Sequence, residues 1–256
     1  MSLARQHRDA VLGKLSAAVA PPAEGGPALP AVAASTPEAA AAAQMAMRLR
    51  HDLVRLKQIQ SITKKIEAKR EMLPHYDAWV AGVCDALDRG VAGDVGEILP
   101  TVMVWRIDTA DYAGAADLAE RVILHRLPLP TRYQRQAPTL IVEEIADAAL
   151  RDLGNGEAAP LDVLEDIERL THGEDMPDEV RAKLMKAIGF EYDRRAAAAS
   201  ELPDAAADLA EAQRRALSAM AAAHKLHDRS GVKDRMRKIE RSQAKAATAA
   251  AASAPQ

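Results

Sequence analysis

Lysine and arginine side chains gather in two separate stretches of the sequence, and their chemistry is that of anion binding. Residues 48–70 contain eight lysines and arginines against Asp52 and Glu67. Residues 225–245 contain eight more, against three acidic residues. Because the whole chain has a formal net charge of −3, the part between these stretches must be strongly acidic. The pattern indicates an acidic body with a basic segment toward each end, and anionic partners at those ends.

Carboxylates are the second group with possible chemistry. Two or three of them that converge on divalent cations can support hydrolysis of a phosphodiester. Acidic clusters occur at Asp108 and Asp111, at residues 143–147 and at residues 165–168. Most alternate with apolar residues, which places them on the solvated side of amphipathic helices. The catalytic residues are therefore unknown from the sequence, with Asp108 and Asp111 as weak candidates.

Motifs for metals and cofactors are missing from the sequence. His224 and His227 are three residues apart, but no cysteine or third ligand lies near them. There is no glycine-rich phosphate loop of the Walker type, and no serine or cysteine in a nucleophile motif. We therefore expect no bound metal and no cofactor.

The apolar pattern predicts helices throughout, and so an all-α fold. Hydrophobic residues make up 48% of the chain and aromatic residues only 3%. They recur at spacings of three and four, and no alternating β-branched run suggests a strand. The central stretch Thr101–Pro130 predicts two helices joined by an acidic turn, with the other helices stacked around them. Small residues at 113–116 are expected where these two helices touch.

A long basic helix is predicted before this hairpin. The helix start at Thr36-Pro37-Glu38 is followed by no breaker up to Leu73. This predicts one helix over 37–73 with an imperfect heptad seam, like that of a coiled coil, which could pair with itself or with a partner. Its cations either contact phosphates or lie on a solvated face, and charge alone leaves both readings open. These cations are Arg48, Arg55, Lys57, Lys64, Lys65 and Lys69.

The whole chain is expected to divide into five parts. We predict a flexible arm and linker over 1–36, the long basic helix over 37–73, a helical-hairpin core over 74–200, a C-terminal helix pair with a basic end over 201–245, and a disordered tail over 246–256. The hairpins are expected to form a short solenoid, loosely like tetratricopeptide repeats. No apolar run is long enough to span a bilayer, so we expect no membrane partner.

Several stretches together carry a family resemblance. They are TVMVWRIDTADYAGAADLAERVILHRLPLP at Thr101–Pro130, DMPDEVRAKLMKAIG at Asp175–Gly189, KREMLP from Lys69, and residues 139–150. The chain resembles the small, or endonuclease, subunit of DNA-packaging terminases from temperate contractile-tailed phages, the GpM type. The resemblance covers roughly residues 45–241.

This resemblance implies a role in viral DNA packaging in the cytoplasm of the bacterial host. Such a subunit binds concatemeric double-stranded phage DNA and acts with a large ATPase subunit. The two subunits together cut the DNA and load it into a prohead. The family label includes endonuclease activity, although the residues of this chain support DNA binding and partner docking better than cutting. Mg²⁺ would be needed only if this chain itself cleaves DNA. The resemblance also implies a homo-oligomer, for which a ring is one closed arrangement.

The rival interpretation is a helical-repeat adaptor that binds only protein, with its basic ends solvated. Under the DNA-binding interpretation, the phosphate contacts are assigned first to the N-terminal basic stretch and second to the C-terminal one. The assigned residues are Arg48, Arg55, Lys64, Lys65, Lys69 and Arg70, followed by Lys233, Arg235, Arg237 and Lys238.

Overall fold

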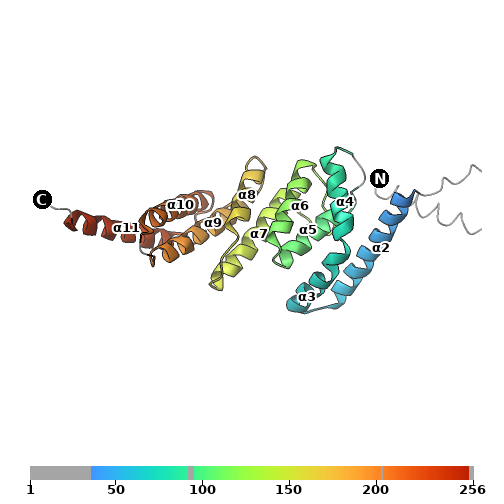
Figure 1. Cartoon of the computed structure of the whole chain (residues 1–256), viewed down its shortest axis with the longest axis horizontal. Coiled ribbons are helices and arrows are strands. Elements are labelled where there is room, and N and C mark those ends of the chain that lie inside the picture. The colour runs from blue at the N-terminus through green and yellow to red at the C-terminus, as the bar shows by residue number, and fades with distance from the viewer. Residues whose placement is uncertain (1–35, 92–94, 203, 254–256) are drawn as a thin grey trace, which may run out of the picture. The chain divides into compact units, whose positions relative to one another are not determined.

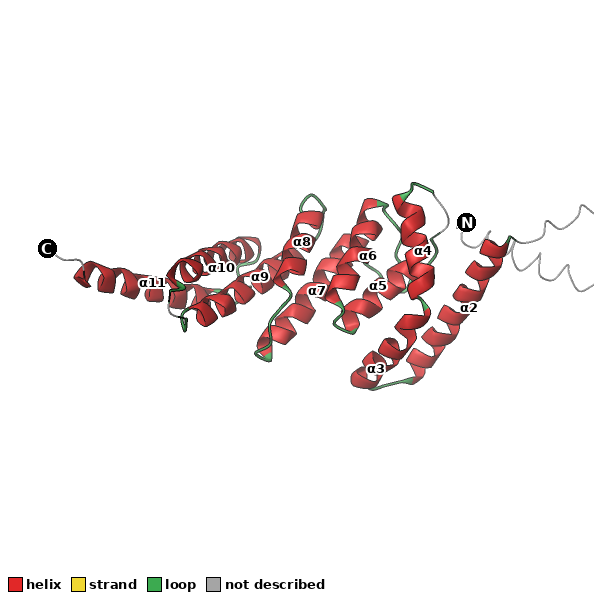
Figure 2. Cartoon of the chain, viewed as in Figure 1, coloured by secondary structure: helices red, strands yellow, loops and turns green. Residues whose placement is uncertain are grey.

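The structure, a computed structural model, describes residues 36–91, 95–202 and 204–253. Within these ranges every regular element is a helix and no strand is present (Figure 2). The prediction of an all-α fold is therefore confirmed for the described part of the chain. None of the described helices is long and apolar enough to cross a membrane. The predicted arm over 1–36 lies outside the described residues, apart from Thr36, which caps the first described helix.

The basic stretch near the N-terminus folds as two helices, and the predicted single helix over 37–73 is wrong. The elements are α2 over Pro37–Gln58, α3 over Ile62–Met72 and the short 3-10 helix η1 over Leu73–His75. The break comes where Ser61 caps α3, since its hydroxyl oxygen accepts a hydrogen bond of 3.3 Å from the backbone N–H of Lys64. Serine favours such a cap because its short side chain competes for backbone hydrogen bonds.

The two helices form a hairpin whose apolar faces are buried within the chain. α2 buries Leu49, Asp52 and Leu56, which belong to the predicted heptad seam, and α3 buries Ala68 and Met72. The helices lie side by side in Figure 1, and side chains join them. Folding back at residues 59–61 removes more apolar surface from water than one extended helix would. We call residues 45–72 the basic hairpin.

The helix at the centre of the core is α5. The three helices of this region are α4 over Asp77–Asp88, α5 over Ile98–Asp108 and α6 over Tyr112–Leu124. Nine of the eleven residues of α5 are buried, and this helix contacts α3, α4, α6 and α7. Its Trp105 meets Tyr76 edge to face, with the ring centroids 5.8 Å apart. The prediction that the other helices stack around this pair is confirmed only in part, because the described helices after residue 177 pack elsewhere in the chain.

The small residues at 113–116 divide between the core and the turn, and Ala116 packs against the core beside Ala115. Ala115 is fully buried, but Ala113 is exposed. Gly114 gives room to the side chains of Arg106 and Asp111 rather than to a neighbouring backbone. The turn between α5 and α6 therefore uses its glycine to fit an ion pair.

The C-terminal half consists of five helices: α7 over Ala137–Gly154, α8 over Leu161–Thr171, α9 over Asp178–Ala199, α10 over Ala206–Leu226 and α11 over Lys233–Ser253. α9 packs against both α7 and α10, and α10 turns into α11 through Gly231, whose φ of 77° suits glycine. Residues 246–253 of the segment predicted as a disordered tail continue α11, and residues 254–256 lie outside the described residues. Alanine has the highest helix propensity, so an alanine-rich end can extend a helix that has already begun.

A glycine sets the distance between α9 and α10. A Cβ atom at Gly189 would lie 2.7 Å from Met220 Cγ and 3.2 Å from the carbonyl oxygen of Ala216. We expect Gly189→Leu to lower the free energy of unfolding by about 1–3 kcal/mol, because an added side chain overpacks this contact. Chemical denaturation measures the change. Gly82→Leu is the control, since no atom lies within 4 Å of a Cβ at Gly82 in α4, and an equal loss in both variants would contradict the prediction.

Candidate nucleic-acid interface

A buried hydrogen bond holds the basic hairpin to the start of α4. The hydroxyl of Tyr76 donates to Asp52 Oδ2 at 2.6 Å, and Asp52 is only 8% exposed. Burial and this hydrogen bond to the carboxylate raise the pKa of the Tyr76 phenol, so the hydroxyl remains the donor. An acid at a core-facing position of α2 therefore has a structural partner. The interruption that Asp52 makes in the apolar seam marks this contact.

Ion pairs brace the hairpin further, and they use cations that were assigned to phosphates. Arg55 Nη2 lies 2.9 Å from Glu71 Oε2. Lys69 forms an ion pair with Asp108 at the end of α5, and both side chains are largely covered. Arg70 Nη2 donates to the carbonyl oxygen of Thr109 at 3.4 Å. The structure thus places Arg55, Lys69 and Arg70 in contacts that fix the hairpin to itself and to α5.

Other cations of the hairpin have no such partner. The side chains of Arg48, Lys57 and Lys64 are exposed, and that of Lys65 is half-buried. None of the four makes an ion pair with any described residue. Three of them, Arg48, Lys64 and Lys65, were assigned to phosphates from the sequence. Arg50 is also exposed and makes no ion pair with any described residue. We call Arg48, Arg50, Lys57, Lys64 and Lys65 the free cations of the basic hairpin.

The C-terminal basic residues divide in the same way. On α11, Arg235 Nη1 lies 3.0 Å from Asp193 Oδ2, and its guanidinium stacks over the ring of Phe190 at 4.0 Å. Arg237 lies 3.5 Å from Asp234 on its own helix. Lys233 and Lys238 are exposed and make no ion pair among the described residues. The structure therefore leaves the two lysines available and holds Arg235 against α9.

Cations of the acidic body are mostly neutralised by neighbouring carboxylates. Arg121 lies 2.8 Å from Asp88 and 2.7 Å from Asp117. Arg106 bridges Asp77 and Asp111 at 3.0 and 2.8 Å. Similar pairs hold Arg89, Arg132, Arg135, Arg169, Lys183 and Arg214. An approaching polyanion would have to break these pairs on the body, whereas it meets unpaired lysines on the basic hairpin and α11.

The two weak catalytic candidates serve as structural carboxylates. Asp108 is paired with Lys69. Asp111 caps α6, accepting a hydrogen bond of 3.1 Å from the backbone N–H of Gly114, and also pairs with Arg106. Each carboxylate is held by a different cation, and the described residues contain no group of three or more histidine, cysteine, aspartate or glutamate side chains that could hold a metal. Asp108 and Asp111 are not brought together as a metal-binding pair.

Glu144 on α7 is an acid without an ion-pair partner in the described chain. Its neighbours Asp108, Glu143 and Asp147 have cations of their own: Lys69, Arg135 and Lys183. Burial and the charges of these carboxylates raise the pKa of Glu144, with a smaller opposing effect from Arg151.

We expect Glu144→Gln to raise the free energy of unfolding at about pH 7, where the raised pKa makes the ionised form of Glu144 unfavourable in the folded state. The sign follows from the folded pKa lying above the unfolded one. Ionisation therefore costs stability as the pH rises through the folded pKa, and the gain from the variant disappears below the unfolded glutamate pKa of about 4.3. Urea unfolding at about pH 7, and again at a pH below about 4.3, measures the free energy of unfolding of the variant and of the unaltered protein. Glu120→Gln, at an exposed position of α6, is the control, and a gain independent of pH would contradict the explanation.

A buried glutamate on α9 was missed by the sequence analysis. Glu191 is fully buried and accepts hydrogen bonds from the backbone N–H of Ala159 at 3.1 Å and from Arg194 at 2.8 and 2.7 Å. Arg195 adds a further contact of 3.1 Å. Burial opposes ionisation, but these donors lower the pKa of Glu191. The available signal was its position, seven residues after Leu184, on the apolar stripe of α9.

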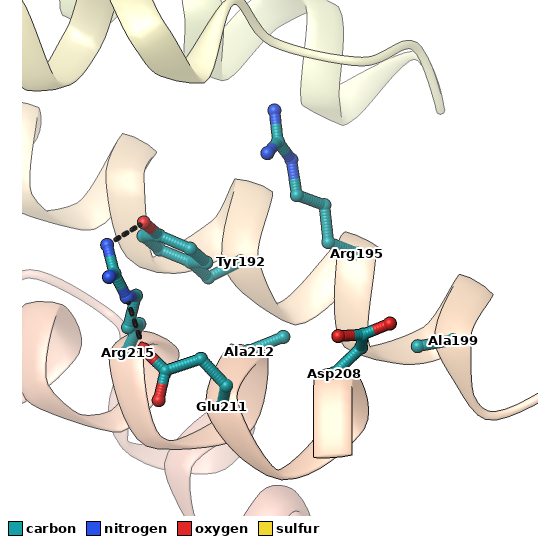
Figure 3. A pocket seen from close by; sticks show the side chains of 7 residues that line it. All are labelled: Tyr192, Arg195, Ala199, Asp208, Glu211, Ala212 and Arg215. Atoms are coloured by element: carbon teal, nitrogen blue, oxygen red, sulfur yellow. Dashed lines mark hydrogen bonds and ion pairs between the residues drawn. The ribbon is translucent and has the colours of Figure 1, made fainter. Parts of the chain in front are cut away.

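A small open pocket between α9 and α10 is lined by Tyr192 and by charged side chains from both helices (Figure 3). The hydroxyl of Tyr192 donates to Glu165 and accepts from Arg215 Nη1 at 2.8 Å. Arg215 also pairs with Glu211 at 2.6 Å. These contacts join α8, α9 and α10. The pocket is thus a structural junction between helices.

Comparison with known proteins adds independent information. A family model described as the phage small terminase subunit matches residues 46–179. A protein of Escherichia phage P2 that bears the name "Terminase, endonuclease subunit" is 38% identical over 198 residues, which is 77% of this chain and 72% of that protein. No solved structure matches the chain. The part of this chain that the family model matches includes the basic hairpin after Met45 and ends at the start of α9. The helix α11 therefore lies outside the matched part.

Proposed function

The chain belongs to the phage small terminase subunit family, and we propose that it binds duplex viral DNA through the basic hairpin and α11. In this role it acts with a large ATPase subunit, and the two together cut concatemeric DNA and load it into a prohead. The place of action is the cytoplasm of the bacterial host. The observation that carries the proposal is the separation of unpaired from paired cations along the described chain.

The energetics favour the unpaired lysines as phosphate contacts. Binding a cation to a DNA phosphate releases condensed counterions, and this release supplies much of the affinity. A lysine with no carboxylate partner gains this without first losing an ion pair. An arginine that is already bridged, such as Arg121 between Asp88 and Asp117, would have to give up both contacts. Its acidic neighbours would also repel the DNA backbone.

Recognition, rather than cutting, is the part of the reaction that the described residues of this chain support. Asp108→Asn and Asp111→Asn each remove a carboxylate that a metal-dependent nuclease could use. Assayed in the complete terminase with Mg²⁺, we expect both variants to keep the cutting rate per folded complex. A cutting rate that falls by more than about a hundredfold in either variant, without loss of folded protein, would place a catalytic carboxylate in this chain.

Self-association and the stacking of the hairpins complete the proposal. The subunit forms a homo-oligomer, for which a ring is one closed arrangement, and its successive hairpins form a short solenoid loosely like tetratricopeptide repeats. Leu49 and Leu56 are buried within the chain, so they are not free to form a coiled coil with a second copy while the hairpin is closed. Native mass measurement of the protein alone, with duplex DNA and with the large subunit tests the assembly. A monomer under all three conditions would contradict it.

Salt titration of DNA binding tests the function itself. Fluorescence anisotropy of a labelled duplex gives the association constant at several salt concentrations. The five free cations of the hairpin predict a log–log slope of roughly −4.5, from about −0.9 per phosphate contact, and contacts from α11 make it steeper. Undetectable binding at low salt would instead support the rival function, a helical-repeat adaptor that binds only protein.

A further inference from the structure

The tip of the basic hairpin, residues 57–65, presents an apolar side chain to solvent. Ile62 is 77% exposed, more than any other large hydrophobic residue in the described part of the chain. It is the first residue of α3 and follows directly after the capping residue Ser61. Its neighbour in the turn, Ile59, is half-buried and packs against the core. The side chain of Ile62 therefore projects into solvent and does not pack against the core of the described chain.

The surroundings of Ile62 indicate which partner it fits. Lys57, Lys64 and Lys65 share the tip with it, and none of them is paired with a described residue. Leu202, another exposed apolar residue, instead comes directly after Glu201 and two residues before Asp204, so the charges near it are acidic. An exposed apolar side chain that is close in sequence to several unpaired cations complements a partner with an anionic rim and an apolar interior. Stacked bases between two phosphate backbones have this arrangement.

The tip is also supported well enough to act as a wedge. Tyr76 and Asp52 join α2 to the start of α4 through their hydrogen bond of 2.6 Å, and Arg55 joins α2 to Glu71 on α3. The Ser61 cap fixes the start of α3. A β-branched isoleucine in a helix has one strongly preferred χ1 rotamer, so little conformational freedom is lost when it enters a tight site.

We propose that Ile62 inserts between two base pairs of duplex DNA from the minor groove, while Lys57, Lys64 and Lys65 contact the flanking phosphates. This inference rests on the DNA-binding function proposed above and adds how the DNA is deformed. Inserted apolar side chains unstack a base step and kink the duplex toward the major groove. Pyrimidine–purine steps such as TA unstack most readily, so the hairpin selects such flexible steps without hydrogen bonds to the bases.

The test uses the full-length protein and a short duplex that contains TA steps. 2-Aminopurine at these steps reports unstacking by increased fluorescence, and a dye pair at the two ends reports bending by energy transfer. We expect both signals to rise with the unaltered protein, to be lost with Ile62→Ala, and to be retained with Ile62→Leu. The salt slope of binding should be the same in all three, because the lysines are unchanged. Val54→Ala, which removes another exposed apolar side chain from α2, should behave like the unaltered protein.

The outcomes separate the insertion from the DNA-binding function. If the unaltered protein and Ile62→Ala bind with the same slope and bend the duplex equally, the insertion is wrong and DNA binding stands. If the unaltered protein does not bind the duplex at any salt concentration, the function itself is wrong and the insertion falls with it. Circular dichroism of Ile62→Ala, an exposed substitution, verifies that a lost signal does not come from unfolding.

Discussion

Replacing Lys57, Lys64 and Lys65 together by glutamine is expected to weaken binding to duplex DNA by about 100-fold at about 0.1 M salt. Each lysine is unpaired in the described chain, so each substitution removes a phosphate contact and the counterions that this contact releases. The salt dependence changes with the affinity. We expect the log–log slope to become shallower by roughly 2.7, at about 0.9 per lysine removed. Fluorescence anisotropy across a salt series measures both quantities.

The matched control removes the same amount of charge from the acidic body. Arg89, Arg169 and Arg214 are exposed arginines, each paired with an acid three or four residues before it in the sequence. Replacing these three by glutamine changes the net charge of the protein as much as the lysine substitutions do. Exposed pairs of this kind contribute little to stability, so the control should fold normally. If both triple variants lose the same affinity, binding follows net charge and not the basic hairpin.

The second large effect concerns stability and lies far from the hairpin. Glu191→Ala is expected to lower the free energy of unfolding by about 3 kcal/mol, because removing one member of a buried charged network leaves the others without partners. The buried N–H of Ala159, in the connection before α8, would lose its acceptor. Arg194 and Arg195 would lose the carboxylate that holds them. Urea unfolding followed by circular dichroism measures the change.

The control and the pH dependence make this prediction specific. Glu211 also accepts hydrogen bonds from two arginines, but its side chain is 45% exposed, so Glu211→Ala should lower stability far less than Glu191→Ala does. The folded pKa of Glu191 is lowered. Its contribution is therefore present above the unfolded glutamate pKa of about 4.3 and is lost as the pH falls through the folded value. If Glu191→Ala and Glu211→Ala lower the free energy of unfolding equally, the burial of Glu191 does not explain its contribution to stability.

Helix starts were the part of the fold most accessible from the sequence. Thr36-Pro37-Glu38 predicted the start of α2, and that helix begins at Pro37. Proline fixes φ at a helical value and needs no hydrogen-bond acceptor there, so the signal is local. The break at Ser61 was not predicted, because a lone serine is tolerated within many helices. It became a cap here because the hairpin buries both apolar faces.

The candidate site was predicted in its composition but not in its detail. The basic stretches could be read directly from the residue types. Which cations remain unpaired could not, since Lys69 meets Asp108 and Arg70 meets Thr109 only after 39 residues of intervening chain have folded. Arg235 meets Asp193 across 42 residues in the same way. Long-range ion pairs leave no periodic signal in a single sequence.

Lysine reactivity in the presence and absence of duplex DNA tests the central claim most directly, because the full chain contains its own controls. Acetylation of each lysine is measured by mass spectrometry with and without a saturating duplex. We predict that Lys57, Lys64, Lys65, Lys233 and Lys238 become protected by DNA. Lys183, paired with Asp147, and Lys186, over the ring of Phe190, should react equally in both samples. Protection of Lys183 and Lys186 with unchanged reactivity at the basic hairpin and α11 would contradict the account.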